Sequence, residues 1–246
     1  MIPFFRKFHR QLATDNKFLN YSRYAIGEIV LVVIGILIAL QVNDWNDNRK
    51  SKIREHMYLK KLHEDVQNMQ DLYSKRMGMA QDNLEIALTG LKYVQNCLPD
   101  PSQERYLDTL LYGHQALPNL YVIRDTYEEM LAANVLANLS NRELKSEITS
   151  FYTRAETFNS YIEYFRTDLG RASSIVWKHV TFGYDQNNEL TVSYDFENLC
   201  GAGEFRNALV EVVDSREDYL SVAQEALVLV GALNESLQAA LEKHPE

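Results

Sequence analysis

The sequence has little of what most catalytic or metal-binding proteins need. Its 246 residues include two cysteines, five prolines and ten glycines. The cysteines show no metal-type pairing, and no G-x-S-x-G, P-loop, H-E-x-x-H or C-x-x-C motif occurs. No glutamate has a histidine three residues later, a spacing that di-iron helical bundles require. We therefore expect no enzyme activity, no bound metal and no cofactor.

Positive charge is scarce in most of the chain. Residues 46–246 carry 20 Lys and Arg against 31 Asp and Glu, a net charge of −11. Such an acidic surface repels phosphate backbones, so we expect no nucleic-acid partner.

Two short acidic stretches contain residue types that are used in catalytic or metal sites. In residues 63–65 (HED), consecutive side chains of a helix point in different directions and do not converge on one ligand. Residues 127–130 (YEEM) are typical of an acidic first helical turn. Both stretches are predicted to be solvated helix faces.

What the chain does have is one long apolar run. Residues 29–40 contain no polar side chain. With its flanks the run reaches the roughly 20 residues needed to cross a bilayer, and Tyr24 and Trp45 sit at its two ends. The alternatives are a buried core helix or a cleaved signal peptide, but no small-x-small cleavage pattern follows the run. The pattern predicts a transmembrane signal anchor at residues 24–46.

Residues 1–23 predict a basic amphipathic lead. They carry five basic residues and one acid. By the positive-inside rule we expect the N-terminus to be cytoplasmic and residues 47–246 to lie across the membrane. Four basic residues at positions 49–54 reduce the contrast between the two flanks, so the opposite orientation stays open.

Beyond the span the apolar spacing stays helical. We expect an all-α chain, with the transmembrane helix followed by an acidic, elongated bundle of three long and two short helices over residues 47–246. The expected starts are a cap at Asp100 before Pro101, a helix near Asp125, a capping box at Ser140 to Glu143 and a last helix from Glu204. A small hairpin is predicted around residues 187–188.

Glu28 is an acid just inside the apolar run. On a helix it shares a face with Gly35 and Ala39, a small-xxx-small pair that Gly27 extends. The carboxylate has three interpretations: it snorkels to the interface, it is satisfied by a partner helix, or it contacts an ion or proton path. The last two require a second copy of the chain or another membrane protein.

Cys97 and Cys200 also have two interpretations. In an oxidising compartment they form one disulfide between distant segments. Otherwise they are two unpaired small core residues. The sequence does not choose between them.

The anchor contains a series of recognisable motifs. These are FFRK at residues 4–7, YAIGEI at 24–29, LVVIGILIALQ at 31–41, and Asn43, Trp45 and Asn46. This signature resembles that of an uncharacterised family of bacterial single-span membrane proteins, and residues 124–152 resemble a second block of it. The resemblance implies a bacterial inner-membrane anchor with a variable helical domain, and it implies no activity.

Together these features predict a membrane-anchored helical interaction or sensory module. Its acidic bundle would bind a partner protein or an envelope component, and its other partners would be the lipid bilayer and a second copy or a membrane protein. The alternative function is an accessory subunit of a transporter, channel or ion-driven membrane complex, with Glu28 at the conduction path.

Overall fold

The computed structural model describes residues 17–243, with side chains at residue 22 and from residue 25 onward. In chain order the elements are α2 (Lys17–Asn96), α3 (Pro101–Gly113), α4 (Asp125–Ala132), α5 (Arg142–His179), β1 (Thr181–Tyr184), β2 (Leu190–Ser193), α6 (Phe196–Gly201) and α7 (Gly203–Lys243). The chain divides into two compact units, residues 1–55 and 56–246. The expected all-α architecture is confirmed. The amphipathic lead falls mostly on residues 1–16, outside the described residues.

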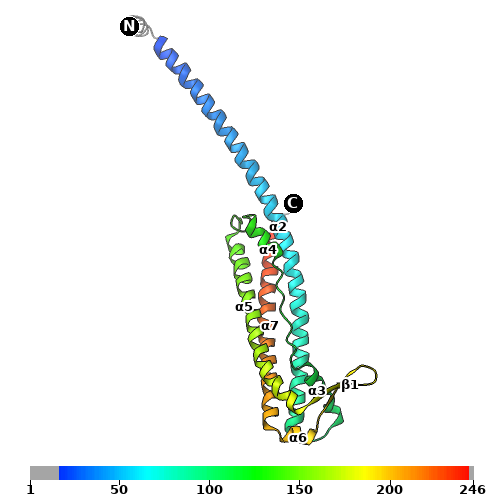
Figure 1. Cartoon of the computed structure of the whole chain (residues 1–246). Coiled ribbons are helices and arrows are strands. Elements are labelled where there is room, and N and C mark those ends of the chain that lie inside the picture. Colours follow the sequence, from blue (N-terminus) through cyan, green and yellow to red (C-terminus); the bar gives the residue numbers. More distant parts are fainter. Residues whose placement is uncertain (1–16, 244–246) are drawn as a thin grey trace. The chain divides into compact units, whose positions relative to one another are not determined.

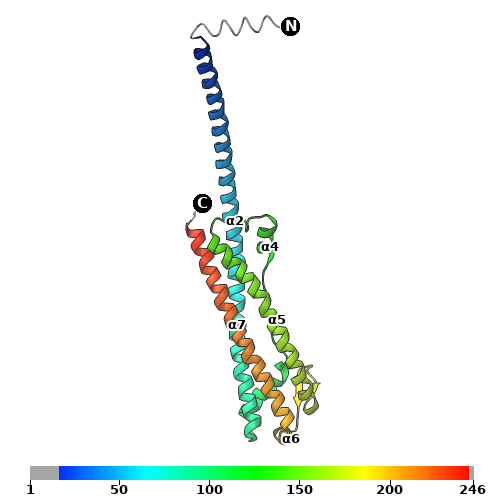
Figure 2. The same cartoon turned by 90° about the vertical axis from the view of Figure 1, so that its left-hand side faces the viewer.

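The second unit has one contiguous apolar core. Residues 56–96 of α2 lie beside α5 and α7 (Figures 1 and 2). Ten of the thirteen buried positions of α7 follow each other at intervals of three and four, which is the spacing that lets helices pack side by side. They are Phe205, Ala208, Val212, Ser215, Tyr219, Ala223, Ala226, Val230, Leu233 and Leu237. Two apolar residues of α2 outside this core, Ile53 and Met57, are exposed.

The order of the helices requires a long return of the chain. Residues 56–96 of α2 and α5 run in the same direction, and α7 runs opposite to both (Figure 1). The short helix α3 lies where α2 ends, whereas α4 lies near the start of α5. Residues 114–124, which we call the return segment, carry the chain back along the bundle between them.

Local capping explains where the short and long helices begin. Asp100 accepts a hydrogen bond from the Ser102 backbone N–H at 2.9 Å, with Pro101 as the first helical residue, as expected. The expected capping box at Ser140 is wrong. Asn141 caps α5 instead, and its Oδ1 accepts from the N–H groups of Glu143 and Leu144 at 3.0 and 3.1 Å. Asparagine is at least as good a cap as serine, so the helix starts one residue later.

The predicted hairpin is confirmed. Strands β1 and β2 pair antiparallel, with Tyr184 opposite Leu190, and Asp185 accepts backbone N–H bonds within the turn. Helix α6 follows, capped by Asp195. It is a third short helix in residues 17–243, where two were expected, because a six-residue helix shows almost no periodicity in the sequence.

Candidate functional site

Residues 26–45 of α2 expose a continuous apolar surface. Their Ile, Leu, Val and Trp side chains are 47–73% exposed. In the described part of the chain, α2 is the one helix long and apolar enough to cross a membrane, judged by length and composition. A contiguous apolar surface of this kind marks a site of membrane or protein interaction.

Glu28 lies on this segment and is exposed. It has no hydrogen-bond or ion-pair partner within residues 17–243. A Cβ built at Gly27 or Gly35 would meet nothing within 4 Å, and Ala39 is exposed as well. The small-residue face is therefore open along the described chain.

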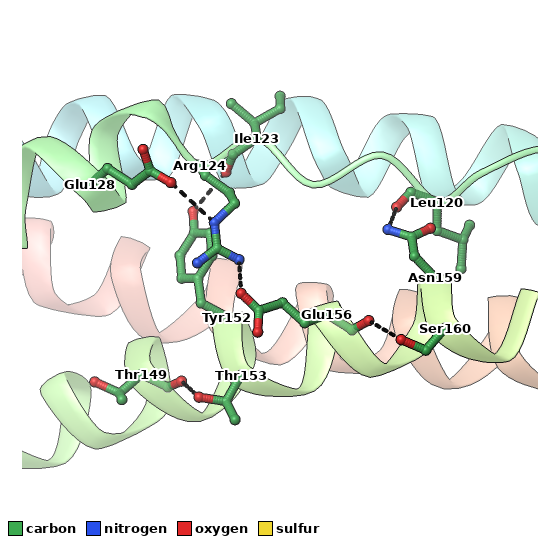
Figure 3. A network of polar contacts seen from close by, with 10 residues as sticks. All are labelled: Leu120, Ile123, Arg124, Glu128, Thr149, Tyr152, Thr153, Glu156, Asn159 and Ser160. Atoms are coloured by element: carbon green, nitrogen blue, oxygen red, sulfur yellow. Dashed lines mark hydrogen bonds and ion pairs between the residues drawn. The ribbon is translucent and has the colours of Figure 1, made fainter. Parts of the chain in front are cut away.

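The return segment is fastened to α5 by a ladder of side-chain hydrogen bonds. Three side chains of α5 each donate to a backbone carbonyl of the return segment. The pairs are Arg166 Nε to Leu117 O at 3.0 Å, Asn159 Nδ2 to Leu120 O at 3.1 Å and Tyr152 Oη to Ile123 O at 3.0 Å. On the other side, the Ile123 N–H contacts Met69 Sδ of α2 at 3.3 Å, so the segment lies between two helices (Figure 3).

The spacing of this ladder has a simple geometric basis. The donors are seven residues apart on α5, a rise of about 10.5 Å. The acceptors are three residues apart, and three residues of extended chain span about 10 Å. Helix and extended backbone therefore stay in step over three rungs. These residues were not predicted from the sequence, although polar residues at seven-residue spacing on the apolar face of a helix are a recognisable signal.

Arg124 ends the return segment and contacts two carboxylates and two rings. Its guanidinium pairs with Glu156 at 2.7 Å and with Glu128 at 3.3 Å (Figure 3). It also lies 5.7 Å from the ring centres of Tyr127 and Tyr152, which stack on each other at 4.0 Å. Both glutamates are about two-thirds exposed, so the ion pairs orient the segment more than they stabilise it.

Arg216 is a buried cation of α7 without a carboxylate partner in the described chain. It is 5% exposed and donates to Asn83 O at 3.1 Å and to Gly113 O at 2.8 Å. Gly113 ends α3, and the last carbonyls of a helix carry partial negative charge. Burial lowers the pKa of Arg216 to about 10. The guanidinium thus fastens α7 to α2 and to the end of α3.

His114 lies beside this guanidinium and is buried. Its Nδ1 is 2.5 Å from Leu111 O, so Nδ1 carries the proton and the carbonyl accepts it. Nε2 has no partner within residues 17–243. Burial lowers the pKa of His114 and the charge of Arg216 adds to this, while the Leu111 bond opposes it. The ring is a neutral packing residue against Trp177.

The structure brings Cys97 and Cys200 together. Both are free thiols, and Cys97 is near enough to Cys200 to contribute, after burial, to raising the pKa of the Cys200 thiol. Cys200 is buried, as the core-residue interpretation expects, whereas Cys97 is exposed. The disulfide remains a prediction.

The two acidic stretches form no ligand cluster. Glu64 is exposed, but His63 and Asp65 are half-buried, so the expected solvated face is wrong for those two. In residues 127–130, Tyr127 and Met130 are buried and the two glutamates are exposed. Within residues 17–243 no three His, Cys, Asp or Glu side chains are grouped as metal ligands.

An open hollow of about 810 Å³ lies at the start of α5, between the loop at residues 137–139 and the first turns of the helix. Lys145 lines it but donates to Ala137 O at 2.9 Å, and Asn141 already caps the helix end. The hollow therefore offers no free buried polar group to a ligand.

Comparison with known proteins identifies a family without an assigned activity. A model described as a family of unknown function (DUF6090) matches residues 28–174. This range includes most of the apolar surface, the return segment and the ladder on α5. No curated protein and no solved structure matches the chain.

Proposed function

We propose that this chain, which belongs to the DUF6090 family of unknown function, is a single-span membrane protein that holds a partner-binding helical unit at a bacterial inner membrane. The exposed apolar surface of residues 26–45 carries the proposal. Ten of the residues from 29 to 40 are Ile, Leu or Val. At the centre of a bilayer such residues are together worth about 3–6 kcal/mol of insertion free energy.

The span covers residues 24–46 and the N-terminus is cytoplasmic. Tyr24 and Trp45 lie at its ends, where interfacial aromatics are favoured. The basic residues before the span favour retention on the cytoplasmic side, and the following unit lies in the periplasm. The YAIGEI-x-LVVIGILIALQ-x-N-x-WN pattern is the signature of this anchor.

The helical unit binds a partner protein or an envelope component. Several aromatic side chains on its surface are 50–73% exposed: Tyr161, Tyr164, Trp177 and Tyr184. Tyrosine and tryptophan supply much of the binding energy in protein interfaces, so their exposure supports a binding role. The unit is also strongly acidic, which favours a basic partner surface.

Membrane insertion is tested with a double substitution in the span. Val33→Lys with Leu37→Lys costs about 5–7 kcal/mol at the bilayer centre, enough to cancel the apolar gain. Val228→Lys is the matched control, because Val228 is 65% exposed on α7. After alkaline extraction of bacterial membranes, wild type and control should stay in the pellet and the double variant should leave it. Extraction of wild type, or retention of the double variant, contradicts a membrane span.

The orientation is tested with protease added to intact spheroplasts. Residues 56–246 should be digested while an N-terminal tag stays protected. Digestion of the tag, with residues 56–246 protected, would show that the orientation is the opposite one.

Glu28 favours a second candidate function, because it is an unpaired acid on the span. In that case the chain is an accessory subunit of a transporter, channel or ion-driven membrane complex. Purification from gently solubilised native membranes, combined with a transport assay, separates the two. The binding-unit proposal expects Glu28→Gln to keep the partner and removal of residues 56–246 to lose it. The subunit alternative expects Glu28→Gln to assemble normally and to abolish transport.

A further inference from the structure

Two cysteines that are far apart in the sequence meet at one end of the helical unit. Cys97 directly follows the last residue of α2, and Cys200 lies in α6. Tyr93 and Phe196, which lie one turn before Cys97 and Cys200, are in contact and bring the two segments together.

The contact between these two segments does not depend on the cysteines. Tyr93 and Phe196, each four residues earlier in its segment, stack with ring centres 4.4 Å apart and planes at 23°. The Asp100 N–H also donates to Tyr93 Oη at 3.3 Å, which holds the chain beyond Cys97 against the same ring. A helical turn separates the two members of each segment, so the aromatic pair and the thiol pair are successive contacts of one interface.

The backbone at Cys97 is unusual for its residue type. Its φ is +53°, and its N–H donates to Tyr93 O at 3.2 Å to close the last turn. This left-handed position after a helix is normally taken by glycine or asparagine. Local backbone preference therefore gives no reason for a cysteine here, whereas pairing with Cys200 does.

We propose that Cys97 and Cys200 are a built disulfide site, which a disulfide-type oxidant closes into an intramolecular cross-link between the end of α2 and α6. The oxidation proceeds through a mixed disulfide between the chain and the oxidant. The exposed Cys97 thiolate attacks one sulfur of the oxidant, the oxidant's own S–S bond breaks, and its first thiolate leaves and takes a proton. Cys200 then loses its proton and attacks Cys97 Sγ, which expels the second thiolate of the oxidant. Two protein thiols are oxidised and one oxidant disulfide is reduced to two thiols.

The order of these steps follows from exposure. Cys97 is exposed and Cys200 is buried, so an oxidant in solution reaches Cys97 first. Burial, followed by the hydrogen bond with Cys97, raises the pKa of the Cys200 thiol, which makes it a poor first nucleophile. Once Cys97 carries the oxidant, the adjacent Cys200 is the resolving thiol.

The cross-link closes a loop of about a hundred residues that contains α3, α4, α5 and the hairpin. Loops of this length give a disulfide its largest effect on the unfolded chain. We expect the oxidised full-length chain to unfold roughly 10 °C above the reduced chain.

The test uses the full-length chain in detergent with oxidised glutathione as the oxidant. Intact mass and maleimide labelling under denaturing conditions report the products. Wild type should lose both free thiols, become lighter by two hydrogen atoms and remain a monomer, and dithiothreitol should reverse all three changes. Cys97→Ser and Cys200→Ser each keep one thiol and should show no gain in thermal midpoint with oxidant.

Three results would overturn the proposal. They are a wild type that keeps both thiols, one that accumulates glutathione on Cys97 while Cys200 stays reduced, and one that forms dimers between copies. The comparison of oxidised with reduced wild type needs no variant. The proposal can therefore be tested even if a serine variant fails to fold.

Discussion

The ladder on α5 makes a specific prediction about Tyr152. The Tyr152→Phe substitution removes only the hydroxyl that donates to Ile123 O at 3.0 Å. The ring stays, with its stacking on Tyr127 at 4.0 Å and its place in the core, where Tyr152 is 1% exposed. The change therefore isolates one rung of the ladder.

The expected cost follows from what the two groups lose. A typical buried hydrogen bond contributes about 1 kcal/mol net, and an acceptor left without a partner costs about 1–3 kcal/mol. Ile123 is half-buried, so its carbonyl regains part of its hydration and the lower end applies. We expect Tyr152→Phe to lower the free energy of unfolding by about 1–2 kcal/mol. In a unit of this size that is roughly 2–8 °C in thermal midpoint.

Thermal unfolding of the full-length chain in detergent, followed by circular dichroism, measures this difference. Tyr161→Phe is the matched control, because Tyr161 lies on the same helix but is 50% exposed. Its effect should stay within about 0.5 kcal/mol. Amide hydrogen exchange at residues 117–124 should rise in Tyr152→Phe and not in the control. Equal midpoints for the two variants would refute the role given to the ladder.

Three further predictions concern the same unit. Gly90→Ala should destabilise it by up to about 2 kcal/mol, because a Cβ would lie 3.1 Å from the buried Leu110 side chain. Gly78→Ala should stabilise it by about 0.5–1 kcal/mol, because a Cβ there would meet nothing within 4 Å. Denaturant midpoints of the two variants measure the difference. Since the pKa of His114 is lowered in the folded state, its contribution to stability should be fully present above about pH 6.5 and should be lost as the pH falls below that value. His114→Phe should remove this loss, which a pH series of thermal midpoints measures. Glu156→Gln should cost less than about 1 kcal/mol and make thermal unfolding less sensitive to salt, because the carboxylate is 66% exposed; a loss as large as that of Tyr152→Phe contradicts this estimate.

Much of the helical architecture could be predicted because its signals are local. Asp100 and Pro101 start α3 through contacts within one turn, and the turn after Tyr184 depends on its own residues. A local capping signal gave the wrong residue where two neighbouring residues can both cap the helix. Ser140 and Asn141 are both good caps, and only the structure shows that Asn141 is used.

The candidate sites divide in the same way. Glu28 and the apolar run could be found from sequence, because hydropathy is a property of consecutive residues. The ladder could not be assigned, because Asn159 needs the distant Leu120 carbonyl as its acceptor. Cys97 and Cys200 illustrate the same limit, since composition left their pairing open.

The sequence by itself determined that this chain is helical, that its second part is acidic, and that one segment is long and apolar enough to cross a membrane. These follow from periodicity, charge and hydropathy, which are properties of short stretches of the chain and do not depend on distant contacts. Only the tertiary structure decided which distant groups meet: three carbonyls of the return segment on α5, Arg216 on the end of α3, and the two thiols at the end of α2. Such contacts depend on the way the long helices pack against each other. Packing is set by the whole core at once rather than by any one stretch of residues.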